Sequence, residues 1–154
     1  MTRLHYTDCG LDWVWLENGF ERHATDYGPG TSITNADDLH QAIAAELVCR
    51  SGALRGQEAQ FLRAFLRMGA DELDLVLAQA GAPSAVSAWE SEREVQVPSA
   101  ASVALRAYVL GVLKVDRPAA RITGSVGNPR EPCAPVVFHL GPFGWTMRRG
   151  PVMP

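Results

Sequence analysis

Apolar residues in the middle of the chain recur at the three- and four-residue spacing that is typical of amphipathic helices. This spacing predicts helices over residues 57–68, 71–80, 84–90 and 98–112. Glycines separate the first three helices and a proline opens the fourth, which are ordinary punctuation signals. The expected inward positions are Phe61, Leu62, Phe65, Leu66, Leu73, Val76, Leu77, Val86 and Trp89. In the last helix, the apolar residues are enough to cover the core and to leave apolar surface for a second subunit; they are Val103, Leu105, Tyr108, Leu110 and Val112.

The first 54 residues have β-type patterning instead. Two β-prone runs, 13–16 and 20–25, flank Asn18-Gly19, and this dipeptide between such runs is the strongest short-range signal for a hairpin. A third short strand can follow the Gly-Pro-Gly break. A helix should begin at Asn35, because an asparagine cap and early aspartates satisfy and complement its N–H groups. We therefore expect a β-hairpin plus helix module over residues 1–54.

The last segment, residues 114–154, is rich in proline and glycine and contains one apolar run at 136–140. Its composition is that of a linker with one short strand. Three interpretations remain open: a disordered tail, a strand that docks on the N-terminal sheet or on a neighbouring subunit, and a basic arm. In the third, Arg148 and Arg149 would contact phosphates. The apolar side chains of 136–145 favour docking.

The charge distribution is uneven along the chain, whose formal net charge is -3. Residues 1–54 hold three basic against eight acidic side chains, and residues 55–113 hold five against seven. Residues 114–154 hold six basic against two acidic ones. A polyanion would therefore meet the C-terminal extension before the central helices.

Composition and motifs narrow the functional classes. The three cysteines are widely spaced, and no run approaches the ~20 apolar residues of a membrane span, so we expect no membrane association and a cytoplasmic protein. His5, Cys9, His23 and His40 are ligand types without the short pairing of a zinc ribbon. We therefore expect no metal and no cofactor. No nucleophile–base pair or phosphate loop is visible, so we expect no enzyme.

The segment from Gly69 to Glu90 resembles the Cro/C1-repressor type of helix-turn-helix, the XRE family. The matching positions are Gly69, Leu75, Val76, Val86, Ser87, Trp89 and Glu90. The N-terminal stretch from Tyr6 to Phe20 resembles a segment that precedes this motif in putative bacterial regulators likened to zinc-ribbon/helix-turn-helix antitoxins, with the zinc ligands missing here. The resemblance covers residues 5–113. It implies a mainly α (α+β) chain, with a five-helix Cro/C1-type domain at 55–113 behind the hairpin module.

The resemblance also implies an interface with double-stranded DNA. Val86 and Trp89 would anchor the recognition helix, which is read here as residues 84–90. The positions that would face DNA are Pro83, Ser84, Ser87, Ala88, Arg93 and Arg55.

Several positions depart from the family pattern. Glu72 stands where the family has a phosphate-binding glutamine, Ala82 replaces a capping serine, and Gln79 replaces an inward leucine. Asp71, Glu72 and Asp74 would place negative charge on a helix expected to cross the phosphate backbone. Proline and alanine also offer no donors to base edges.

Two functional hypotheses follow. The first is a dimeric DNA-binding transcriptional regulator, a repressor or an autoregulating antitoxin, which would be nucleoid-associated and would bind an operator as a homodimer. The second is a degenerate helix-turn-helix that has lost DNA binding and serves as a dimerisation or protein-interaction module. A toxin or another protein would be the partner in that case.

Overall fold

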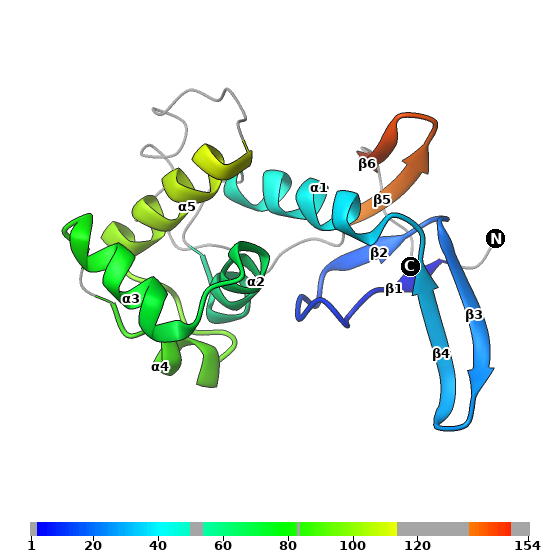
Figure 1. Cartoon of the computed structure of the whole chain (residues 1–154), viewed down its shortest axis with the longest axis horizontal. Coiled ribbons are helices and arrows are strands. Elements are labelled where there is room, and N and C mark those ends of the chain that lie inside the picture. Colours follow the sequence, from blue (N-terminus) through cyan, green and yellow to red (C-terminus); the bar gives the residue numbers. More distant parts are fainter. Residues whose placement is uncertain (1–2, 50–53, 83, 114–135, 149–154) are drawn as a thin grey trace. The chain divides into compact units, whose positions relative to one another are not determined.

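The computed structural model describes residues 3–49, 54–82, 84–113 and 136–148 (Figure 1). They fall into two compact units. The first contains the described residues up to Ala42 together with those from Val136 onward, and the second contains the described residues from Ile43 to Leu113.

The first unit is built on a four-stranded sheet of order β1-β2-β5-β6. The strands are β1 (Leu4–His5), β2 (Val14–Leu16), β5 (Val136–Gly141) and β6 (Gly144–Arg148). β2 and β5 run parallel, with Val14 beside Val136 and Leu16 beside Phe138, and the two outer pairs are antiparallel. The apolar run at 136–140 therefore forms a strand that completes the N-terminal sheet.

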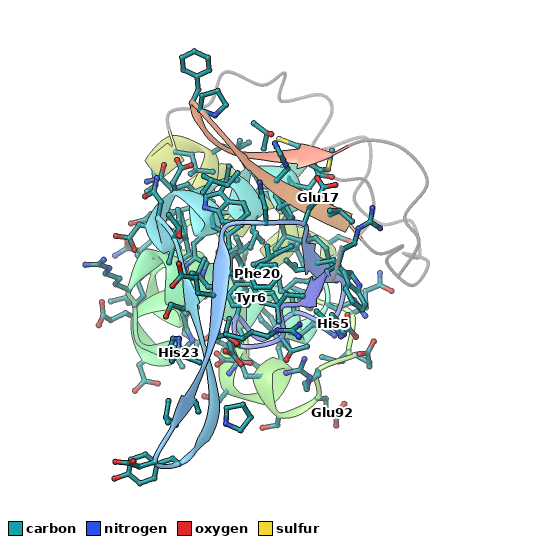
Figure 2. The ribbon with its side chains drawn as sticks, turned by 90° about the vertical axis from the view of Figure 1, so that its right-hand side faces the viewer. His5, Tyr6, Glu17, Phe20, His23 and Glu92 are labelled. Carbon is teal, nitrogen blue, oxygen red and sulfur yellow. The ribbon has the colours of Figure 1, made fainter. Side chains whose placement is uncertain are left out.

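A separate two-stranded ribbon is formed by β3 (Phe20–Thr25) and β4 (Gly28–Ile33). Its turn is Asp26-Tyr27, closed by the Thr25 hydroxyl, which donates to the carbonyl of Gly28. The expected hairpin across Asn18-Gly19 is wrong, because β2 pairs with β1 and β5 and not with β3. Most of the ribbon is exposed, and Figure 2 shows His23 along its length.

Helix α1 (Ala36–Cys49) begins after Asn35 and supplies Leu39 to the core of the first unit. Its second half, from Ile43, belongs to the second unit. The Trp145 amide donates to Asp38 Oδ2 at 2.7 Å, and its indole Nε1 donates to the Thr34 carbonyl at 2.9 Å. These bonds attach β6 to the start of α1. The buried apolar residues of this unit are Tyr6, Leu11, Trp13, Val14, Leu16, Leu39, Val136, Val137, Phe138 and Trp145.

The second unit contains α2 (Gly56–Leu66), α3 (Ala70–Gln79), α4 (Val86–Ser91) and α5 (Ser99–Leu113). These helices match the four that periodicity predicts. An antiparallel bridge between Arg55 and Gln96 links the entrance of α2 to the segment before α5. The buried apolar residues of this stretch are Leu54, Ala59, Phe61, Leu62, Leu73, Leu77, Ala82, Val86, Trp89, Val97, Ala101, Leu105, Val109 and Leu110.

The expected fold class is wrong. The described residues are about 47% helix and 25% strand, with five helices and two sheets, which is an α+β mixture. Only four of those helices lie within 54–113, so a five-helix Cro/C1-type domain behind a hairpin does not describe the chain. The physical reason is the C-terminal segment. Its apolar strands β5 and β6 complete a sheet whose other half lies more than a hundred residues earlier in the sequence.

Candidate nucleic-acid interface

The short helix α4 is held by two buried anchors. Val86 is fully buried and Trp89 is 6% exposed, and they lie three residues apart on the inner side of the helix. The N-terminus of α2 lies tightly against the end of α4, since a β-carbon on Gly56 would collide with the carbonyl oxygens of Trp89 and Glu92. The backbone N–H of Gln57 also donates to the backbone carbonyl of Arg93 at 3.0 Å. These contacts fix the orientation of α4.

A two-pronged ion pair joins the same two helices. Arg63 of α2 donates through Nε and Nη2 to the two carboxylate oxygens of Glu90, at 2.7 and 2.5 Å. Its Nη1 donates to the Met68 carbonyl at 2.9 Å, which ties the pair to the α2–α3 connection. The hydrogen bonds that Arg63 donates to Glu90 raise the pKa of Arg63 against the opposing effect of burial. The geometry is that of a bidentate arginine–carboxylate pair, the strongest kind of side-chain ion pair.

The N-terminus of α4 is capped from a neighbouring helix. The residue before α4, Ala85, has no side chain that can accept a hydrogen bond. Instead, Asp74 Oδ1 of α3 accepts the Val86 backbone N–H at 3.1 Å and the Ser84 hydroxyl at 2.5 Å. The Asp74 carboxylate and the Ser84 hydroxyl are therefore both engaged within the unit, although the sequence placed Asp74 among the charges on a helix expected to cross the phosphate backbone.

The outer edge of α4 is exposed. Ser87 and Ala88 are both exposed, as is Ser91, whose hydroxyl donates to the Ser87 carbonyl at 3.0 Å. Arg93 is exposed in the turn that follows the helix. The structure therefore brings three of the expected DNA-facing residues, Ser87, Ala88 and Arg93, onto or beside one accessible edge.

Arg55, another expected DNA-facing residue, is engaged within the unit. Arg55 lies in ion pairs with Glu58 at 3.5 Å and Glu94 at 2.8 Å, so its charge is already matched within the unit. Pro83 and Arg149 lie outside the described residues. Arg148 ends β6 in the first unit, where its backbone pairs with Val137.

The exposed charges around α3 and α4 are mainly acidic. Asp71, Glu72, Glu92 and Glu94 are exposed, against the two exposed arginines Arg67 and Arg93. Arg67 ends α2 in the left-handed conformation, with φ 58°. The sequence pattern alone does not single out Arg67, although its position in the connection between two expected helices is a usable signal. With Arg67, the exposed basic side chains around α3 and α4 are two, Arg67 and Arg93.

The first unit has polar clusters of its own. The rings of His5 and Trp15 stack at 4.3 Å, and Glu17 Oε2 lies 3.2 Å from His139 Nδ1 (labelled in part in Figure 2). The Tyr6 hydroxyl and His40 Nε2 are 2.9 Å apart. Within the described ranges, no group of three histidine, cysteine, aspartate or glutamate side chains could hold a metal ion. No helix in the described part of the chain is long and apolar enough to cross a membrane.

Comparison with known proteins identifies no similar protein. No protein-family model matches the chain, and no curated protein or solved structure matches it significantly.

Proposed function

We propose that the second unit binds double-stranded DNA through the outer edge of α4, and that the protein is a DNA-binding transcriptional regulator. The observation that carries the proposal is the way α4 is held. Trp89 and Val86 are buried on one side, and Ser87, Ala88 and Ser91 are exposed on the other. A short helix with one side fixed and the other exposed is what major-groove recognition requires.

The dimensions and chemistry of α4 are compatible with a groove. Six residues make a helix about 9 Å long, and the major groove is about 12 Å wide. The Ser87 hydroxyl can donate to or accept from a base edge, and the Ala88 methyl can contact a thymine methyl. Arg67 before α3 and Arg93 after α4 are the groups that would contact phosphates.

The acidic surroundings set the expected strength of binding. Two arginine–phosphate contacts per copy predict a salt slope of only about −2 per copy. The four exposed carboxylates would oppose non-specific binding, so affinity for random duplex should be weak. A homodimer reading two half-sites of an operator would double the contacts, as a repressor or an autoregulating antitoxin does.

Fluorescence anisotropy of the full chain with labelled duplexes tests the proposal. The probes are overlapping duplexes from the region upstream of the protein's own coding sequence, with scrambled duplexes of equal length. Ala88→Glu should raise the dissociation constant at least about tenfold, because it places a carboxylate in the groove. Thr31→Glu makes the same charge change on the exposed ribbon of the other unit and should leave binding unchanged. The proposal fails if the unaltered chain prefers no upstream duplex at low salt.

A second candidate function, protein docking, is favoured by one observation. Leu75 on α3 is 62% exposed, and the exposed Asp71 and Glu72 lie one turn before it on the same side of the helix. An exposed leucine beside carboxylates suits a partner with apolar and basic side chains, such as a toxin or another basic protein. Leu75→Asp would abolish co-purification of such a partner and leave DNA affinity unchanged if the two functions use different surfaces.

A further inference from the structure

We propose that the outer face of α5 is the homodimer interface of this protein, so that the occupant of the face is a second copy of the chain. We define the α5 face by five of the exposed residues of this helix, which are Ala100, Ala107, Tyr108, Gly111 and Val112; Ser99, the first residue of α5, is also exposed but is not counted in the face. Tyr108 is 39% exposed and Val112 is 51% exposed.

The α5 face carries no charge. The helix has one charged residue among its fifteen, Arg106, and that side chain is fully buried. A surface helix normally places charged and polar side chains opposite its buried stripe, whereas a helix that is apolar all round is normally covered. The described surface of α5 therefore has the composition of a contact surface and not of a solvated one.

Charge explains why a second copy fits this face. The chain carries a formal net charge of -3, and the exposed parts of α3 and of the segment after α4 carry Asp71, Glu72, Glu92 and Glu94. Two copies that approach through those surfaces would repel each other. The α5 face lets identical copies meet without opposing like charges, and a two-fold contact sets the same uncharged residues against each other.

Gly111 adds a geometric observation that the single chain does not explain. It lies within α5 and has no positive φ, although glycine destabilises a helix relative to alanine. A β-carbon there would meet no atom of the described residues within 4 Å, so nothing in the described part of the chain requires its absence. Because glycine has no β-carbon, the backbone of a second α5 could approach closely at this position.

The same open space provides the test. Gly111 is exposed and a β-carbon there meets no described atom within 4 Å, so Gly111→Arg adds a side chain outward and puts two guanidinium groups into a two-fold contact. Sedimentation equilibrium of the full chain without DNA should give twice 16.7 kDa for the unaltered protein. In the Gly111→Arg variant, the dimer dissociation constant should rise at least about tenfold.

Ala64→Arg is the matched control, since it adds the same charge to an exposed position of α2 and should leave the dimer intact. Circular dichroism of Gly111→Arg should show unchanged helix content, which separates lost association from lost folding. A monomeric unaltered chain over the whole concentration range would overturn the proposal, as would a Gly111→Arg variant that dimerises as tightly as the unaltered chain. Because the mass is measured without DNA, this result is independent of the proposed DNA binding.

Discussion

The Asp74 carboxylate of α3 accepts the first backbone N–H of α4, that of Val86, at 3.1 Å. A helix usually takes this cap from the side chain of its own preceding residue, which is Ala85 here and has no side-chain acceptor. The same carboxylate oxygen accepts the Ser84 hydroxyl, so one side chain fixes both the turn and the helix that follows it. Asp74 is thus a structural carboxylate that positions the proposed DNA-binding edge.

Replacing Asp74 by alanine should destabilise the second unit. Loss of the cap and of the Ser84 bond predicts a decrease in the free energy of unfolding of about 1–2 kcal/mol, measured by urea titration. Asp74→Asn keeps an acceptor and should recover part of the loss. Asp71→Ala, at an exposed position of the same helix, should change stability by less than about 0.5 kcal/mol. Equal effects of the Asp71 and Asp74 variants would contradict the capping role.

The Arg63–Glu90 pair should show measurable coupling. Its side chains are only 22% and 13% exposed, so solvent screens the pair less than an ordinary surface ion pair. A double-mutant cycle with Arg63→Ala and Glu90→Ala should give a coupling energy of about 1–3 kcal/mol from urea unfolding. The exposed Arg67 and Glu72 provide a comparison cycle that should give a value near zero. A coupling energy near zero for Arg63 and Glu90 would mean that the bidentate contact does not stabilise α4.

Acidification should weaken the first unit through His40. Burial lowers the pKa of His40 from 6.5, with Asp37 opposing, so the folded state favours the neutral ring. The unfolded chain takes up a proton near pH 6.5 while the folded chain does not, so stability is complete above that pH and falls as the pH drops below it. Urea midpoints between roughly pH 7 and 5 should fall for the unaltered chain and stay flatter for His40→Gln. His23→Gln, on the exposed ribbon, should keep the original pH dependence.

High pH should destabilise the first unit through Tyr6, whose hydroxyl lies 2.9 Å from His40 Nε2. Burial, with smaller contributions from Cys9 and Asp8, raises the pKa of Tyr6 from 10.0 to about 12. The folded state favours the neutral phenol, so its contribution to stability is complete below pH 10 and is lost as the pH rises toward 12. Ultraviolet titration of the phenolate should show one tyrosine with a midpoint near 12, absent in Tyr6→Phe. An unchanged titration curve in Tyr6→Phe would contradict the assignment.

The helices of the second unit could be predicted from the sequence because their signals are local. Apolar spacing placed α2 to α5 within a few residues, and Val86 and Trp89 were expected as anchors. The capping role of Asp74 could not be predicted because it depends on a tertiary contact between α3 and α4. The ion pair of Arg55 could not be predicted for the same reason, since its partner Glu94 lies thirty-nine positions away in the sequence.

The sheet of the first unit could be predicted less well from the sequence than the helices of the second unit. Asn18-Gly19 has the local composition of a hairpin turn, and Gly19 does adopt a positive φ of 74°. The Asn18 side chain, however, bonds to β5, and a β-carbon on Gly19 would collide with the Trp145 ring. A strand 122 positions further along the chain thus takes the place of the expected hairpin partner. Local patterns carry no information on such a pairing.

Asn18 should therefore control the docking of β5. Its Nδ2 donates to the Leu140 carbonyl at 3.0 Å, and its Oδ1 accepts the Leu140 N–H at 2.7 Å. Asn18→Ala leaves both part-buried backbone groups without this partner, so stability should fall by about 1–3 kcal/mol. Hydrogen exchange of the Leu140 amide should accelerate by the corresponding factor, whereas the Leu62 amide of the second unit should be unaffected.

Asn18→Asp gives the more specific comparison. It retains an acceptor for the Leu140 N–H and loses the donor to the carbonyl, so it should protect the Leu140 amide better than Asn18→Ala does. Asn18→Ala with unchanged Leu140 exchange would show that the β2–β5 ladder holds the C-terminal strand without this side chain. The ladder alone spans three residue pairs, Val14 with Val136 to Leu16 with Phe138, and stops before Leu140. For that reason we expect the side-chain bonds, and not the ladder, to limit opening at this end of β5.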